Sequence, residues 1–206
     1  MLFRETVSPE TLDLLKILQS LPEFRDLRLV GGTSLALQIG HRKSVDLDFF
    51  GKISESLEEL THIIGQFATV EPLSSSRMMR FFRVNGVKVD IVNYPYPWIG
   101  DAVEEDGIVL AGIKDIAAMK LAAITNRGTK KDFIDYYFLL QQYEFIDLLG
   151  FYLQKYPDAQ LFAPLKSLTY FDDANQDPMP FMYKNVEWDE VKSHISRIVS
   201  DYYRQR

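Results

Sequence analysis

The chain has 206 residues, of which 47% are hydrophobic and 25% charged, and its formal net charge is −6. These values are typical of a globular protein, and they exclude a general nucleic-acid coat, which needs clustered basic residues. The chain has no cysteine, which excludes disulfide scaffolds, zinc–thiolate sites and thiol nucleophiles, and which favours a reducing, cytoplasmic location. The apolar runs are too short for a membrane span, and the first residues lack the apolar segment of a signal peptide.

The first 67 residues predict helices that alternate with short strands. A helix begins after Ser8, with Pro9 at its first position, and ends at Pro22, because serine and proline favour helix starts. The elements expected next are a strand over 28–30, a short helix over 33–39 that Gly40 stops, a strand over 45–50 and a helix from Ser54 to about Phe67.

A β-hairpin is predicted around Asn85-Gly86, because both residues tolerate the positive φ of a type I′ turn. The two strands, over 78–84 and 87–92, would then pair Val84 with Val87 and Phe81 with Asp90. One face of this hairpin would be apolar, and its members would be Phe82, Val84, Val89 and Ile91. The opposite face would hold Phe81, Arg83, Lys88 and Asp90.

The chain changes character after a short strand over 108–110 and becomes mostly helical. We expect helices over 115–125, 131–143, 146–156 and 188–203, with a polar, proline-containing loop over 171–180. The predicted fold class is therefore α/β (α+β), with a small mixed sheet flanked by helices. Residues 1–112 would form this core, and residues 113–206 a helical region that completes an active-site cleft.

Two aspartates, Asp46 and Asp48, are predicted to point the same way from one strand, with Cα atoms roughly 6.5–7 Å apart. Such a pair repels unless it is solvated or neutralised, and Mg²⁺ or Mn²⁺ would neutralise it. Asp90, on the predicted neighbouring strand, adds a third carboxylate that could also accept a proton from an attacking hydroxyl. The alternatives are a solvated edge strand for the pair, and a surface ion pair of Asp90 with Lys88 or Arg83.

A diglycine, Gly31-Gly32, ends the strand at Val30 and precedes Thr33 and Ser34. Glycines let backbone N–H groups approach an anion, hydroxyls add donors, and a helix start adds the positive end of its dipole. No Gly-Lys-Ser/Thr follows at the spacing of a P-loop, so this is not that motif. The alternative is an ordinary turn.

Two further groups lie in the helical half. Lys120 sits in a helix otherwise rich in alanine, isoleucine, leucine and methionine, where it could present its ammonium to a cleft or reach out to water. Lys131 and Asp132 begin the next helix, where the aspartate could be functional or could simply cap the helix.

The segments VGGTSL, SVDLDFF and VKVDIV together resemble the DNA polymerase β-type nucleotidyltransferase superfamily. With KLAAITNRGTKKDFIDYYFL further along, the chain resembles the AbiEii/AbiGii toxin family more closely. This resemblance, over about residues 25 to 145, implies metal binding by Asp46, Asp48 and Asp90. It implies catalytic roles for these three and Lys120, and nucleotide contacts by Gly31, Gly32, Thr33, Ser34, Arg42, Lys131 and Asp132. The broader superfamily often has serine where this chain has Gly32, so either Thr33 or Ser34 would take over its hydroxyl role.

The predicted function is Mg²⁺- or Mn²⁺-dependent transfer of a nucleoside monophosphate from an NTP to an acceptor hydroxyl. The resemblance implies a tRNA or protein acceptor, a toxin role and an antitoxin partner, with no membrane involvement. Two alternatives stay open: a non-catalytic interaction protein on the same fold, and a kinase-like phosphotransferase.

Overall fold

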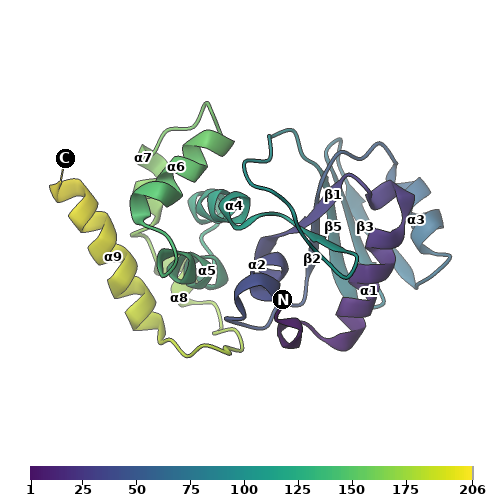
Figure 1. Ribbon diagram of the computed structural model, residues 1–206, viewed down its shortest axis with the longest axis horizontal. Helices are drawn as coiled ribbons and strands as arrows, with labels where there is room; N and C mark the ends of the chain where they lie inside the picture. Colours follow the sequence, from purple (N-terminus) through teal and green to yellow (C-terminus); the bar gives the residue numbers. More distant parts are fainter. Residues whose placement is uncertain (206) are drawn as a thin grey trace. The chain divides into compact units, whose positions relative to one another are not determined.

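The computed structural model describes residues 1–205, which form two compact units (Figure 1). Residues 1–96 and 101–112 make the first unit, while residues 97–100 join the chain from Ile113 onward in the second. The helices of the first unit are η1 (Arg4–Thr6), α1 (Pro9–Ser20), η2 (Pro22–Phe24), α2 (Gly31–Ile39) and α3 (Leu57–Ile64). Its strands are β1 (Leu27–Val30), β2 (Leu47–Gly51), β3 (Val70–Ser75), β4 (Met79–Val84), β5 (Val87–Asn93), β6 (Val103–Glu105) and β7 (Ile108–Leu110).

The first unit is built on a mixed sheet that is seven-stranded over the described residues, with the order β3-β4-β5-β2-β1-β7-β6. Strand β2 lies at its centre, antiparallel to β1 and parallel to β5. Strand β7 adds to β1 in parallel, and β6 and β3 form the two edges. The predicted mixed α/β fold class is therefore confirmed.

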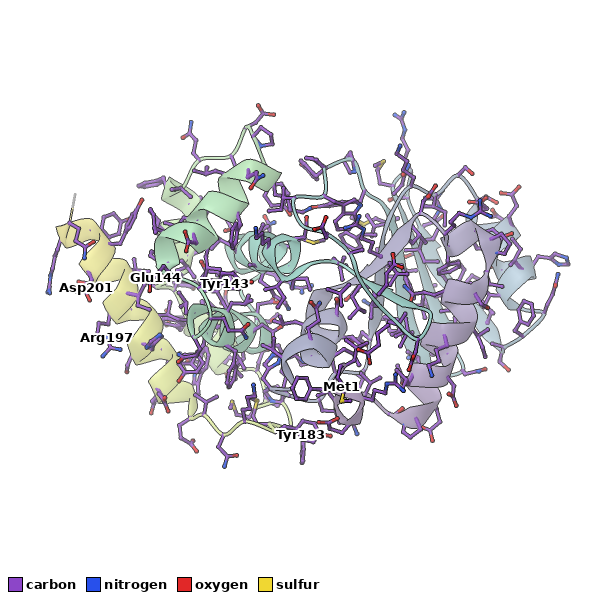
Figure 2. All side chains as sticks on the ribbon, in the orientation of Figure 1. Met1, Tyr143, Glu144, Tyr183, Arg197 and Asp201 are labelled. Carbon is purple, nitrogen blue, oxygen red and sulfur yellow. The ribbon has the colours of Figure 1, made fainter. Side chains whose placement is uncertain are left out.

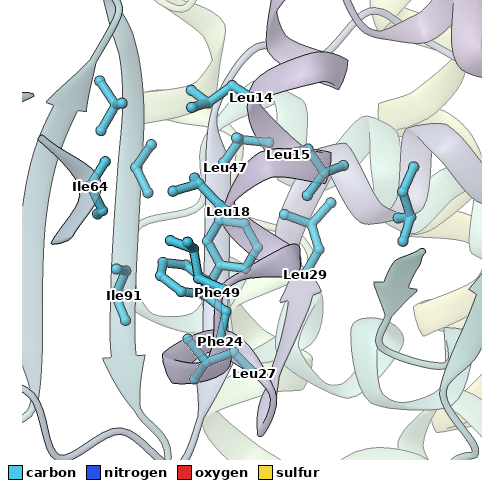
Figure 3. Packing of buried hydrophobic residues seen from close by; sticks show 14 of the residues in the cluster. Leu14, Leu15, Leu18, Phe24, Leu27, Leu29, Leu47, Phe49, Ile64 and Ile91 are labelled. Carbon is cyan, nitrogen blue, oxygen red and sulfur yellow. The ribbon is translucent and has the colours of Figure 1, made fainter. Parts of the chain in front are cut away.

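The predicted hairpin is present with the expected register. Val84 pairs with Val87 and Phe81 with Asp90, and Asn85 and Gly86 have φ values of 47° and 82°. The apolar face of β4 and β5 is fully buried against α1 and α3, as Figure 3 shows for part of this core. The opposite face of β5 is therefore the one that carries polar side chains.

The sheet core also explains how β2 is oriented. Leu47 and Phe49 are completely buried, while Asp48 and Phe50, which alternate with them, are only partly buried. Leucines of α1 cover the buried side, and the ring of Phe24 meets Phe49 edge-on at 5.1 Å between centroids. Burial of alternate residues is expected for a strand with one face on the core, so Asp48 must point to the other face.

Several boundaries differ from the sequence prediction. Strand β2 begins at Leu47, not at Val45, so the prediction that Asp46 lies within this strand is wrong. Helix α3 is capped by Ser56 rather than starting at Ser54, because Ser56 and Glu59 form a reciprocal capping box. Helix α2 begins two residues earlier than expected, at Gly31. Edge strand β3 was not predicted, since its mostly exposed residues lack an apolar alternation.

The second unit is helical. Its helices are α4 (Ile113–Asn126), α5 (Lys130–Leu140), α6 (Phe145–Lys155), α7 (Phe162–Ser167), α8 (Asp172–Asn175) and α9 (Trp188–Arg204). Helix α9 buries Val191, Ile195 and Val199, whereas Arg197 and Asp201 extend from it toward solvent (Figure 2). Short α8 interrupts the segment predicted as a loop. Over residues 1–205, none of the helices combines the length and the apolar content that crossing a bilayer requires.

Candidate active site

Two of the predicted carboxylates lie side by side on the polar face of the first unit's sheet. Asp48 of β2 is the register partner of Asp90 of β5 in a parallel pair. Neighbouring strands are about 4.8 Å apart, so two carboxylates at one register position face each other closely. The polar face therefore concentrates negative charge where β2 begins.

Asp46 joins this charge from outside the strand. Its backbone carbonyl accepts a hydrogen bond from the Thr33 hydroxyl, which ties the segment before β2 to helix α2. Its side chain is partly buried, and its charge acts on the ammonium of Lys88 together with the charges of Asp48 and Asp90. Strand register thus brings Asp48 and Asp90 together, whereas a local loop contact holds the backbone of Asp46.

Lys88 is the basic partner of this acidic group. Its Nζ lies 2.6 Å from Asp90 Oδ2, and the side chains are 48% and 13% exposed respectively. Partial burial works to lower the pKa of Lys88, but the bond to Asp90 and the charges of Asp90, Asp48 and Asp46 raise it overall. The alternative of an ion pair between Asp90 and Lys88 is thus observed, although Asp90 is too buried for an ordinary surface pair.

The diglycine bend lies directly against Asp48. Gly31 has a φ of +68°, and a Cβ added there would come within 2.3 Å of Asp48 Oδ2. Only glycine has both the conformation and the small size that this approach requires. The first N–H groups of α2, which have no partners within a helix, therefore start beside the acidic pair.

We expect Gly31→Ala to lose activity beyond its cost in stability. A left-handed alanine costs about 1–2 kcal/mol, and its methyl group would also push Asp48 aside. Gly86→Ala is the matched control, because its φ is +82° but nothing lies within 4 Å of the added Cβ. Urea unfolding should show similar losses of unfolding free energy for the two variants, whereas nucleotidyl transfer should fall only for Gly31→Ala. Equal activity of the two variants would contradict the assigned role of the bend.

Gly32 makes room for an arginine. A Cβ on Gly32 would lie 2.3 Å from Nη2 of Arg42 and 3.4 Å from Oγ of Ser44. Arg42 is buried, and its Nη1 donates to the carbonyl of Lys43 at 3.0 Å. The guanidinium therefore lies over the first turn of α2, in the space that a serine side chain at position 32 would need. This gives a steric reason for the departure from the superfamily pattern.

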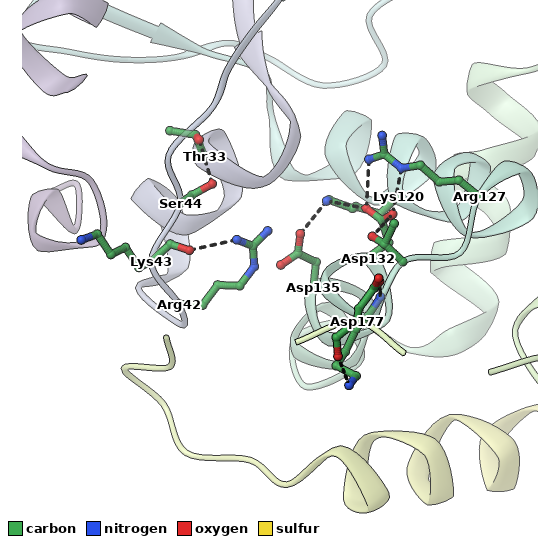
Figure 4. Close-up of polar contacts among 11 residues, drawn as sticks. Thr33, Arg42, Lys43, Ser44, Lys120, Arg127, Asp132, Asp135 and Asp177 are labelled. Carbon is green, nitrogen blue, oxygen red and sulfur yellow. Dashed lines mark hydrogen bonds and ion pairs between the residues drawn. The ribbon is translucent and has the colours of Figure 1, made fainter. Parts of the chain in front are cut away.

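Both hydroxyls that follow the diglycine are buried and engaged within the first unit. Thr33 Oγ1 lies 2.8 Å from Ser44 Oγ, a contact drawn in Figure 4, and also bonds the carbonyl of Asp46. Ser34 Oγ accepts from the amide of Gln38 at 3.2 Å. The role of Thr33 or Ser34 in phosphate contact stays a prediction, and the observed bonds give Thr33 a role in holding the loop of Asp46.

The second unit contains a buried cluster of charges between α4 and α5 (Figure 4). Lys120 Nζ lies 3.0 Å from Asp132 Oδ1 and 2.5 Å from Asp135 Oδ2. Asp132 also accepts from Arg127 Nε at 3.1 Å and from the Thr129 hydroxyl at 2.7 Å. Two cations and two anions thus meet in a cluster where Lys120, Asp132 and Asp135 are almost fully buried.

These contacts show how the downstream residues are bonded within the second unit. Lys120 does not extend to water, and Asp132 does more than cap α5, since it bridges Lys120 and Arg127. Lys131 is exposed, whereas its neighbour Lys130 is buried against the carbonyls of Asn175 and Asp177. Lys131 is therefore open to solvent, whereas Lys130 binds the segment that contains Asn175 and Asp177.

Sequence reasoning did not assign site roles to three charged residues of these clusters. Lys88 was expected on the same face as Asp90, as an ion-pair partner or as part of a basic strip, but not as part of the acidic site. Arg127 and Asp135 follow Lys120 at intervals that cross the turn between two helices. The contacts of Arg127 and Asp135 with this cluster depend on how α4 packs against α5. The hydrophobic periodicity of the sequence does not specify that packing.

We expect Asp132 to make stability depend on acid pH. Burial works to raise its pKa, but Lys120, Arg127 and Thr129 lower it from 3.8 to about 2. This stabilisation, about 2 kcal/mol, is complete above the ordinary pKa and is lost as the pH falls through about 2. The difference in unfolding free energy between wild type and Asp132→Asn, measured in urea, should therefore shrink by about 2 kcal/mol between pH 5 and pH 2. A constant difference would contradict the assignment.

The donor set around Asp48 fits a hard divalent cation. The charges of Asp46, Asp48 and Asp90 all act on Lys88, and Oδ1 of Asp90 is buried without a hydrogen-bond partner among residues 1–205. Carboxylate oxygens are the ligands that Mg²⁺ and Mn²⁺ prefer. Within the same residues, no three acidic or histidine side chains already surround a common metal position, so joint coordination requires side-chain movement.

Comparison with known proteins identifies the family of the chain. The family model "Nucleotidyl transferase AbiEii toxin, Type IV TA system" matches residues 13–204. An uncharacterised Aquifex aeolicus protein, aq_aa25, is 33% identical over 201 residues, covering 94% of this chain and 96% of its own length. JHP933 from Helicobacter pylori has a similar fold, with a TM-score of 0.57 at 19% identity over 97% of this chain and 94% of that one. A candidate nucleotidyltransferase from the same organism gives a TM-score of 0.59 at 19% identity over 96% of both chains. The chain belongs to the AbiEii family of nucleotidyl transferase toxins of type IV toxin–antitoxin systems.

Proposed function

We propose that this nucleotidyltransferase uses Asp46, Asp48 and Asp90, with Mg²⁺ or Mn²⁺, to transfer a nucleoside monophosphate from an NTP to an acceptor hydroxyl. The observation that carries the proposal is the register of Asp48 with Asp90 beside the Gly31 bend. An acidic pair against a helix start offers a place for a cation next to donors for a phosphate chain.

Each group has a role in this reaction. Asp46 and Asp48 hold the metal, and Asp90 shares it and accepts the proton of the acceptor hydroxyl. The acceptor oxygen then bonds to the α-phosphorus while the bond from that phosphorus to the bridging oxygen breaks, and pyrophosphate leaves. The chemistry that the bound metal supplies is neutralisation of phosphate charge and polarisation of the phosphoryl oxygens.

Donors of the first unit would receive the triphosphate. The backbone N–H groups at Gly31 and Gly32 begin α2, and the buried guanidinium of Arg42 lies over that turn. A planar guanidinium binds phosphate oxygens in pairs and keeps its charge at any physiological pH. From the family pattern, Thr33 or Ser34 would add a hydroxyl contact, and Lys131 and Asp132 would contact the nucleotide. Lys120 or Lys131 would offset the charge of the leaving pyrophosphate.

The acceptor and the biological setting are part of the same proposal. A tRNA or protein hydroxyl would receive the nucleotide in the cytoplasm, and an antitoxin protein would oppose the reaction. The family match to a type IV toxin supports the toxin role. The net charge of −6 argues against long nucleic-acid coverage, so a tRNA would be held at its end rather than along its length.

Incubation with α- or γ-labelled NTP and a total tRNA or protein fraction tests the reaction class. The proposal expects the α-label on the acceptor in the presence of Mg²⁺ or Mn²⁺, with release of pyrophosphate. Transfer of the γ-label alone would establish a phosphotransferase, and transfer of neither label would leave a binding module. Asp46→Ala serves as the matched negative control, and it should abolish labelling.

A further inference from the structure

Lys88 occupies the acidic site with its own positive charge. Its Nζ contacts Asp90 Oδ2 at 2.6 Å, a length expected for a strong charge-assisted hydrogen bond. Lys88 and Asp90 are two residues apart on β5, so both side chains leave the strand on the polar face that also carries Asp48. The ammonium is therefore held beside the carboxylates by the strand itself.

The charge of this lysine acts on the whole acidic group. The charges of Asp46 and Asp48, as well as that of Asp90, contribute to raising the pKa of Lys88. Three carboxylates in one partly buried place repel one another, and a single ammonium offsets part of that repulsion. The other oxygen of Asp90 is buried and has no donor among the described residues, so the compensation is incomplete.

The two arginines of the neighbouring strand β4 are engaged elsewhere. Arg83 is the cross-strand partner of Lys88, but its Nε pairs with Glu71 at 3.3 Å. Arg80 lies on the other face of β4, where its Nε donates to the carbonyl of Glu55 at 2.9 Å. Arg83 thus carries the same charge as Lys88 on the same pair of strands without serving the acidic group.

We propose that Lys88 is the resident counter-ion of the acidic site and that a divalent cation must displace its ammonium from Asp90 when the site is loaded. This inference rests on the proposed function, because it takes Asp46, Asp48 and Asp90 as the metal ligands. Lys88 acts through Asp90 and is a positioning residue. Its half-exposed, flexible stem allows the ammonium to move into solvent when the cation binds.

Titration of the full chain with Mn²⁺ alone tests this competition. The electron paramagnetic resonance signal of free Mn²⁺ reports how much of the ion is bound. We expect Lys88→Met to bind Mn²⁺ about tenfold more tightly, because Asp90 no longer has to release a charged partner. Lys88→Arg keeps the charge and should stay within about threefold of wild type. Arg83→Met removes one charge from the neighbouring strand and should also stay within about threefold.

Thermal unfolding provides a second readout that does not depend on activity. Without divalent cation, Lys88→Met should unfold at a lower temperature than wild type, because the carboxylates lose their counter-ion. At the same Mn²⁺ concentration its unfolding temperature should rise more than that of wild type, since stabilisation by a ligand grows with the logarithm of the ratio of its concentration to Kd.

The outcomes separate the two proposals. If wild type binds Mn²⁺, Asp48→Asn does not, and Lys88→Met binds no more tightly than wild type, the counter-ion role is overturned and the metal site stands. An equal gain in Mn²⁺ affinity for Arg83→Met and Lys88→Met would also overturn it. The loss of any one positive charge near the site would then explain both gains. If neither wild type nor Lys88→Met binds Mn²⁺, the metal site of the proposed function falls, and this inference falls with it.

Discussion

Replacing Asp48 by asparagine is expected to lower nucleotidyl transfer by about 10³-fold or more while leaving the fold intact. Asparagine keeps the shape and loses the charge that would hold the metal. Metal stabilisation of developing charge is worth several kcal/mol, and every 1.36 kcal/mol is a factor of ten in rate. Because Asp48 faces another carboxylate, removal of its charge also relieves repulsion, so stability should be kept or slightly raised.

Transfer of α-labelled nucleotide by wild type and Asp48→Asn, with the unfolding temperature of each, measures this effect. Glu104→Gln is the matched control, since it removes an exposed acid on edge strand β6 of the same unit. It should retain full activity. Activity of Asp48→Asn above one tenth of wild type would contradict the role of the acidic pair.

Much of the geometry around Asp48 follows from local signals in the sequence. Asn85-Gly86 specifies a turn with two residues at positive φ, and this turn fixes which residues of β4 and β5 pair. The alternation of Leu47 and Phe49 with Asp48 fixes which face the aspartate takes. Such signals depend only on neighbours along the chain, so periodicity and turn chemistry were sufficient to find them.

The features that the sequence did not predict depend on contacts between distant segments. Nothing in the sequence indicates that the guanidinium of Arg42 fills the space beside Gly32, because the two residues meet only after α2 has folded back on the following loop. Asp46 was assigned to a strand because Asp-x-Asp alternates, yet its loop is held by a hydroxyl from Thr33. Side-chain bonds of this kind override local preference, and one sequence alone does not show them.

Another contact between distant segments that the sequence did not predict lies in the second unit, where a lysine at the end of α6 is completely buried. Lys155 Nζ lies 2.7 Å from Asp115 Oδ1 and 3.0 Å from the carbonyl of Pro97, and the ring of Trp98 is 4.7 Å from it. Asp115 also accepts the N–H groups of Ile99 and Gly100 at 3.0 and 2.8 Å. One ion pair therefore fixes residues 97–100 onto helices that follow them in the chain.

Lys155→Met is expected to destabilise the protein by about 3–5 kcal/mol. Methionine fills a similar volume, but it leaves the carboxylate of Asp115 buried with two backbone N–H groups and no opposing charge, which is the costly way to break a buried pair. Urea unfolding of wild type and variant measures the loss. Replacing both residues, as Lys155→Met with Asp115→Asn, should cost less than the sum of the single changes, because no buried charge remains.

The neighbouring Lys114 separates this effect from a simple loss of positive charge. Lys114 is exposed and lies 5.6 Å from the centroid of the Phe151 ring, so Lys114→Met should cost less than about 1 kcal/mol. Equal losses for the two lysines would show that the pair with Asp115 does not hold residues 97–100. A large loss for Lys155→Met alone, reduced when Asp115 is also changed, would show that the cost comes from an uncompensated carboxylate.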